Sequence, residues 1–270
     1  MKVEEYKHVI SLGFACAVAS ETERIGLRSG SGPFDWQANV SFKDRIELMD
    51  RGVEHFLDYI NEDDLWQHAD QPWIYFIPKL GVHLVHDFNA YQPLEKQIER
   101  VKDKYQRRIK RFNNSIKERT LFIRYIYNLE ELSWILGNVN YINGVIKKYN
   151  RDNEIVYIAN QDIITPPISA ISLYTVKRDP GTEIVENFID RSSEIKELLC
   201  NLPFSQSQKK KNLYLYHKKQ NHKKWDKLFK YPKKLYWKLL RKPYRHKNRF
   251  DFTEYNLNAV KGVYLKFDLQ

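Results

Sequence analysis

Short apolar segments alternate with longer helix-like segments along the first two hundred or so residues, and this alternation constrains the fold more than any other feature of the chain. Strand-like and helix-like segments in alternation are typical of a parallel sheet covered by helices. We therefore predict a three-layer α/β sandwich with a mainly parallel sheet, and keep an α+β arrangement as the alternative. The predicted strands are 8–13, two strands within 73–88, 120–127, 154–159 and 171–178. The predicted helices are 16–27, 41–57, 93–117, 131–149 and 182–199.

Cysteine content and hydropathy limit the class of protein. The chain has only two cysteines, Cys16 and Cys200, which disfavours a disulfide framework and favours a reducing compartment. The amino-terminal residues lack the pattern of a secretory signal, and no stretch reaches the roughly 18 uninterrupted apolar residues that span a bilayer. The scattered histidines lack the spacing of metal ligands. We expect a cytoplasmic protein, soluble or peripherally bound to a membrane, with neither a metal nor a cofactor.

Cys16 lies between a predicted strand and a predicted helix. Val9 and Ile10 end the strand, and Gly13 permits a sharp turn before the helix-forming residues that follow. Near a helix N-terminus, unpaired backbone N–H groups and the helix dipole favour a thiolate, and backbone N–H groups after Gly13 could also hold a developing oxyanion. The alternative is that Cys16 only fills space in the core, as free cysteines commonly do.

A thiol nucleophile usually requires an imidazole base. Among the five histidines before residue 204, His86 is the preferred candidate because Asp87 follows it. In a regular strand, however, Asp87 would share a face with His83 and not with His86. The group that orients His86 would then come from another segment, such as Asp35, unless the strand is broken here. The alternative is a half-buried histidine held by the backbone.

The positive charge is concentrated near the C-terminus. Residues 209–249 contain 17 Lys or Arg and one acidic residue, a net charge of +16. Because the whole chain has a net charge of +11, the remaining residues together have a net charge of −5. Aromatic residues and leucines recur near helical spacing between the lysines, and Pro232 predicts a kink. This composition predicts a helix on an anionic membrane surface, and we disfavour the alternative of nucleic-acid binding. The predicted membrane-surface residues are Trp225, Lys227, Phe229, Lys233, Lys234, Trp237 and Arg241.

These patterns predict three regions. Residues 1–204 form the catalytic-type α/β domain, 205–250 form the basic extension, and 251–270 form a C-terminal segment that could pack back on the domain. The oligomeric state is left open.

Several motifs together resemble a mostly bacterial family labelled as papain-like cysteine peptidases. They are ISLGFAC, GLRSGSGPFDW, HDF, KYQRRIKRF and LFIRY, and the resemblance covers roughly residues 8–165. It implies that Cys16 is the nucleophile and His86 the base. It also implies that the site is lined by Ser11, Arg28, Asp35, Trp36 and Arg124.

The chain departs from papain in several respects. The C-G-S-C-W signature and the upstream glutamine of papain are absent, and the base follows the cysteine by only about seventy residues. The SLGxxC arrangement looks more like the first turn of an SGNH-type esterase or a cysteine acyltransferase, on a flavodoxin-like sheet. By analogy with enzymes of surface-polysaccharide assembly, we expect a cysteine-dependent hydrolase or acyltransferase that acts on glycan or envelope precursors at the inner membrane surface.

A different class of function starts from the arginines. Guanidinium groups bind phosphate or carboxylate in a bidentate way, so an anion pocket would make the protein a non-catalytic or glycosyltransferase-like accessory that binds an anionic sugar or nucleotide. The candidates are Arg28, Arg107, Arg108, Arg111 and Arg124. Arg124 interrupts an apolar strand and needs a partner, for which we expect Asp35 or a bound anion.

Overall fold

The computed structural model describes residues 4–228, except 15, 29, 39–40, 91, 164–167, 180–184 and 186, together with residues 264–265. Its centre is a four-stranded parallel sheet in the order β1-β6-β7-β8. The strands are β1 (His8–Ser11), β6 (Thr120–Ile126), β7 (Glu154–Asn160) and β8 (Leu173–Val176). Every residue of β6 is buried, as expected for a central strand that is covered on both faces. The predicted α/β class is confirmed.

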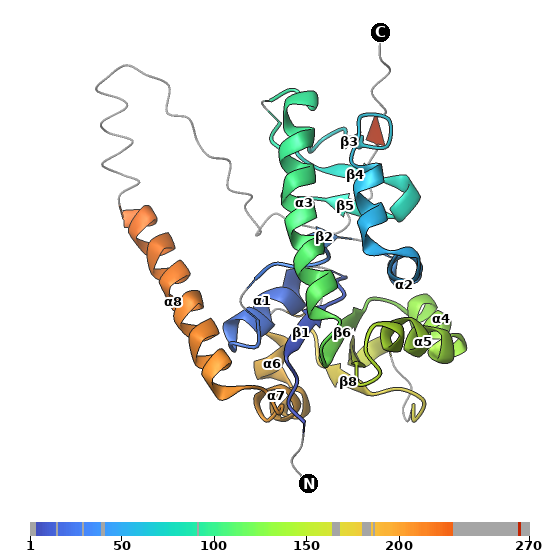
Figure 1. Cartoon of the computed structure of the whole chain (residues 1–270), viewed down its shortest axis with the longest axis vertical. Helices are drawn as coiled ribbons and strands as arrows, with labels where there is room; N and C mark the ends of the chain where they lie inside the picture. Colours follow the sequence, from blue (N-terminus) through green and yellow to red (C-terminus); the bar gives the residue numbers. More distant parts are fainter. Residues whose placement is uncertain are drawn as a thin grey trace.

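Helices cover both faces of this sheet (Figure 1). One face packs on α1 (Cys16–Arg24), α6 (Phe188–Arg191) and α7 (Ser193–Cys200). The other face packs on α2 (Phe42–Arg51), α3 (Glu95–Ser115), α4 (Leu129–Gly137) and α5 (Val139–Tyr149). Apolar side chains therefore form a separate core on each side of the sheet, which is the arrangement of a three-layer sandwich.

The segment between α1 and α3 contributes four strands to a second, antiparallel sheet in the order β2-β5-β4-β3-β9, in which β9 comes from near the C-terminus. Its strands are β2 (Gln37–Ala38), β3 (Trp66–His68), β4 (Tyr75–Ile77), β5 (Val82–Leu84) and β9 (Tyr264–Leu265). Short 3-10 helices span Val53–Tyr59, Pro78–Leu80 and, after β7, Gln161–Ile163. The two strands predicted within 73–88 are thus β4 and β5, joined by the 3-10 turn that starts at Pro78 and ends at Gly81 in the left-handed conformation.

Three predicted helices are divided. Gly52 ends α2, Asn138 separates α4 from α5, and Ser192 separates α6 from α7. Residues 182–184 and 186 of the predicted helix 182–199 lie outside the described residues.

The basic extension begins with α8 (Gln206–Leu228), which lies along α1 (Figure 1). The Asn212 amide donates to the Gly26 carbonyl (3.0 Å), and Lys219 pairs with Glu23 (2.9 Å). No helix of the described residues is long and apolar enough to cross a bilayer. Of the predicted membrane-surface residues, Phe229, Lys233, Lys234, Trp237 and Arg241, like the predicted kink at Pro232, lie outside the described residues.

Candidate active site

Cys16 is the first residue of α1 and follows Ser11, the last residue of β1, by five residues, so it lies beyond the carboxyl end of the edge strand. The carboxyl end of parallel strands is where ligands bind in open α/β sheets. Cys16 is half-buried and forms no disulfide within the part of the chain that the structure describes. The first backbone N–H groups of a helix have no intrahelical acceptor, so they are available to a thiolate or an oxyanion at this position.

Two buried arginines hold the chain just before the cysteine. Arg45 Nη1 donates to the Leu12 carbonyl at 2.6 Å, and Arg124 Nη1 donates to the same oxygen at 3.0 Å. Arg45 comes from α2 and Arg124 from the middle of β6, so the helix layer and the sheet each contribute one arginine to the same carbonyl. The sequence analysis did not identify Arg45 as a site residue.

Arg45 is fixed by further contacts. Its Nη2 donates to Gln37 Oε1 at 2.6 Å, and its guanidinium carbon lies 4.4 Å from the centre of the Phe34 ring. Burial lowers the pKa of Arg45 well below its ordinary value, and the positive charge of Arg124 lowers it further. Gln37, which the sequence also does not single out, thereby links the start of β2, through Arg45, to the turn that precedes Cys16.

Arg124 is fully buried, and its partner differs from the prediction. Glu131 accepts from Arg124 Nε at 2.9 Å and from Nη2 at 2.6 Å, which is a bidentate pair. The expected pairing of Arg124 with Asp35 is therefore wrong. Glu131 lies in the first turn of α4, where the chain returns over the carboxyl end of β6. Its carboxylate therefore lies beside the Arg124 guanidinium, in the place expected for Asp35.

Gly13 makes the turn possible. Its φ is +85°, in the region that favours glycine, and its N–H donates to Ser11 Oγ at 3.1 Å. A Cβ on Gly13 would lie 2.3 Å from Arg45 Nη1. Ser11 is buried, and this hydrogen bond makes its hydroxyl part of the turn.

The candidate base, His86, follows the end of β5 in a bent segment, so the strand is broken at this point. Its ring meets the Trp36 ring edge to face, with centroids 6.1 Å apart. Burial lowers the pKa of His86 to about 4, against the opposing effect of the Asp87 carboxylate, while Lys104 and Arg108 lower it further. The imidazole is consequently neutral near pH 7, which is the form that accepts a proton.

Asp87 is bound to α3. Its buried carboxylate pairs with Lys104 and accepts a hydrogen bond from the Tyr105 hydroxyl at 2.9 Å. Asp87 therefore affects His86 through its charge, while these hydrogen bonds hold its carboxylate against α3.

Asp35 organises the loop that carries Trp36. One carboxylate oxygen accepts from Arg28 Nη2 at 2.7 Å and from the Gly32 N–H at 2.5 Å. Trp36 Nε1 donates to Ser31 Oγ at 2.9 Å. The Arg28–Asp35 pair is buried and fixes the loop whose tryptophan contacts His86, which makes Asp35 a positioning residue for that contact.

The five arginines proposed as one anion pocket do not act together. Arg124 binds Glu131, Arg28 binds Asp35, and Arg111 donates to the Ser31 carbonyl at 2.8 Å. Arg108 is buried with its guanidinium 5.2 Å from the Tyr105 ring centre, and Arg107 is exposed. Among the described residues, no three His, Cys, Asp or Glu side chains are grouped so that they could hold a metal ion.

Residues 7–148, more than half of the chain, match the family described as "Putative papain-like cysteine peptidase". The chain belongs to this family. The matched range contains Cys16, His86, and the residues around them, and it ends within α5.

A curated relative is the uncharacterized protein R408 of Acanthamoeba polyphaga mimivirus, which is 27% identical over 142 residues. The match covers 46% of this chain and 64% of the relative, so the chain spans less than two thirds of that protein. No solved structure matches the chain.

Proposed function

We propose that the protein is a cysteine-dependent hydrolase or acyltransferase in which Cys16 is the nucleophile and His86 the base. The observation that supports this most is the position of the Cys16 thiol at the first residue of α1, after a turn that two buried arginines hold. A side chain serves as a nucleophile only when it is held in place, and the contacts at Leu12 fix the backbone that carries this one.

The chemistry follows that of other thiol nucleophiles. The neutral imidazole takes the thiol proton, the sulfur attacks the carbonyl carbon of an acyl substrate, and helix N-terminal N–H groups hold the oxyanion. The leaving group departs with the proton from the imidazolium, which leaves a thioester on Cys16. Water or an acceptor hydroxyl then gives a proton to the neutral imidazole as its oxygen attacks this thioester. The imidazolium returns that proton to the departing sulfur, and the acyl group leaves as the acid or on the acceptor.

The alkylation rate of Cys16 tests this proposal, and Cys200 is a control within the same chain. Cys200 is exposed and ends α7, whereas Cys16 begins α1, where unpaired N–H groups and the helix dipole favour a thiolate. With iodoacetamide at pH 6, we expect Cys16 to react about tenfold faster than Cys200, because a thiolate reacts and a thiol does not. Peptide mass spectrometry over time gives both rates from one sample.

The His86→Gln variant makes the test specific. It should bring the Cys16 rate close to that of Cys200 and leave the Cys200 rate unchanged. Slower alkylation of Cys16 than of Cys200 in the parent chain would contradict a nucleophilic role.

The substrate proposal is less specific. A glycan or envelope precursor at the inner membrane surface stays a prediction from the resemblance. The alternative, an accessory protein that binds an anionic donor through Arg28 and Arg124, is weakened because Arg124 is fully buried and bonded to Glu131.

We further propose that α8 lies on an anionic membrane surface. At about 100° per residue, Tyr214, Lys218 and Trp225 fall on one side of the helix, opposite Asn212, which holds α8 to the α1 loop. Tyr214 is 66% exposed and Trp225 59% exposed. Aromatic rings between lysines are suited to the headgroup region, where the rings enter the interface and the ammonium groups meet anionic lipid.

Vesicle sedimentation of the full chain tests the membrane proposal. We expect binding to vesicles of 30% phosphatidylglycerol in phosphatidylcholine, little binding to pure phosphatidylcholine, and release by added salt, which screens the charges. A double variant, Tyr214→Ser with Trp225→Ser, should weaken binding several-fold. Leu129→Ser is the matched control, because Leu129 is equally exposed, at 63%, but belongs to α4. Equal binding to both kinds of vesicle would contradict the proposal.

A further inference from the structure

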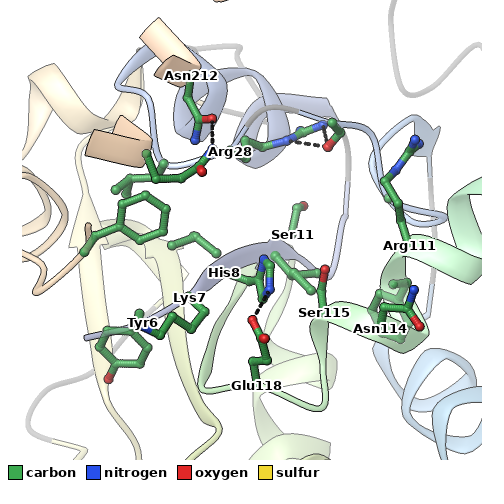
Figure 2. A pocket seen from close by; sticks show the side chains of 18 of the residues that line it. Tyr6, Lys7, His8, Ser11, Arg28, Arg111, Asn114, Ser115, Glu118 and Asn212 are labelled. Carbon is green, nitrogen blue, oxygen red and sulfur yellow. Dashed lines mark hydrogen bonds and ion pairs between the residues drawn. The ribbon is translucent and has the colours of Figure 1, made fainter. Parts of the chain in front are cut away.

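The edge strand β1 borders a cavity. The cavity has a volume of about 610 Å³ and extends along the whole of β1. Figure 2 shows His8 and Ser11 on the strand, with Arg28 on one side and Arg111, Asn114 and Ser115 of α3 on another. Because β1 ends the order β1-β6-β7-β8, β6 pairs with only one of its two edges.

The backbone of β1 presents hydrogen-bonding groups to this cavity. The Leu12 N–H donates to the Ile123 carbonyl of β6 at 2.8 Å. Since successive N–H groups of a strand alternate in direction, Ile10 also faces β6, and Val9 and Ser11 direct their backbone N–H and C=O away from it. These are the polar groups that a further strand would pair with.

An extended segment already uses the start of this edge. The Tyr6 N–H donates to the Pro203 carbonyl at 2.7 Å, and Tyr6 forms an isolated parallel bridge with Phe204. The chain then turns into α8 at Gln206 and leaves the edge. Beyond this pairing, the cavity lies along His8–Ser11, so a further strand can bind there. This part of β1 is about 13 Å long, at roughly 3.3 Å per residue.

Polar side chains lie among the apolar ones that line the cavity, and its charged groups leave positive charge in excess. Ser205, Ser207 and Gln208 line it beside α8, and Asn114 and Ser115 line it on α3. The two acidic side chains of the lining are paired, Asp35 with Arg28 and Glu118 with His8. With Lys7 and Arg111, the lining holds three cationic side chains against two acidic ones, so one positive charge is in excess before His8 is counted.

We propose that this cavity binds an extended acidic peptide as an additional strand on β1. Main-chain hydrogen bonds to Val9 and Ser11 supply the affinity, as in other cases of strand addition, and Lys7 and Arg111 select acidic side chains. Peptide binding here does not depend on the chemistry at Cys16. The peptide would pair with the open edge of β1, whereas Cys16 lies beyond the carboxyl end of the strand.

The probe is the peptide acetyl-Thr-Glu-Val-Glu-Thr-Val-amide, labelled with fluorescein for anisotropy and unlabelled for NMR. Because strand addition depends on main-chain bonds, a generic extended peptide suffices at millimolar concentration. We expect slower amide hydrogen exchange at Val9 and Ser11 of the full chain on peptide binding, with no change at Ile10, which already faces β6. The same peptide N-methylated at its adjacent central Val and Glu should bind at least about tenfold more weakly, because either edge of the peptide then loses a donor.

Arg111→Glu should also weaken binding about tenfold through charge reversal. Arg107→Glu is the matched control, since Arg107 is exposed on the same helix and outside the cavity lining. Three results would each overturn the proposal: no binding of the parent peptide at 5 mM, binding without slower exchange at Val9 and Ser11, or equal binding of the N-methylated peptide.

Discussion

Replacing Glu131 by glutamine should lower the free energy of unfolding by about 3–5 kcal/mol, as expected when one partner of a buried ion pair is removed. The Arg124 side chain is 0% exposed, and Glu131 accepts two of its N–H groups. A glutamine keeps the size of the side chain but leaves the guanidinium charge without its counter-ion. Arg45 lies close enough to add repulsion, because the charge of Arg124 already lowers the pKa of Arg45. Urea denaturation followed by circular dichroism measures the loss.

Glu154→Gln is the control for this prediction. Glu154 pairs with Arg119 at 2.9 Å, but its side chain is 52% exposed, so water can solvate both groups after the change. We expect a loss of less than about 1 kcal/mol. Similar losses for the two variants would show that the Arg124–Glu131 pair is not the buried anchor of the turn before Cys16.

The buried pair also shows what the sequence reveals and what it hides. An arginine inside an apolar strand signals a need for a partner, and Arg124 is correctly predicted to have one. The local sequence also carries a signal for that partner. Asn128 accepts from the Glu131 N–H at 2.8 Å, so Asn128 and Glu131 occupy the N-cap and third positions of α4, in the spacing of a capping box. A helix that starts right after β6 returns its first turn to the end of the strand, which brings Glu131 to Arg124.

Arg45 was missed for a different reason. A charged residue inside a predicted amphipathic helix is usually solvated, and nothing in composition distinguishes this one. The spacing of Arg45 does distinguish it from a solvated residue. Arg45 is three residues after Phe42 and four before Met49, which places it on the buried face of α2. The hydrophobic stripe of the helix therefore contained the signal.

The sheets show a similar division between predictable and hidden features. The long apolar segments of β6 and β7 identify themselves by composition, and so does the pair β4–β5, interrupted at Pro78. Composition does not say which strands pair. The two-residue strand β2 and the three-residue strand β3 are too short to show an alternation of apolar and polar residues. The antiparallel sheet that carries His86 to Trp36 therefore became visible only in the structure.

Replacing Gly13 by alanine should lower the free energy of unfolding by about 3 kcal/mol. A positive φ costs an alanine roughly 1–2 kcal/mol, and forcing a methyl group into a packed site costs about 1–3 kcal/mol more. The new Cβ would lie 2.3 Å from Arg45 Nη1. Arg45 cannot move aside cheaply, because it is bonded to Leu12 and Gln37 and packs on Phe34.

Gly144→Ala is the matched control for Gly13→Ala. Gly144 lies inside α5, where a Cβ would meet nothing within 4 Å, so the same chemical change should raise the free energy of unfolding by up to about 1 kcal/mol. Thermal and urea denaturation of both variants measure the opposite signs. The Gly13 variant should also lose the faster alkylation of Cys16, since a displaced Arg45 no longer holds the carbonyl of Leu12, while the Gly144 variant keeps it. Unchanged alkylation of Cys16 in a destabilised Gly13 variant would separate the stability of the turn from the reactivity of the thiol.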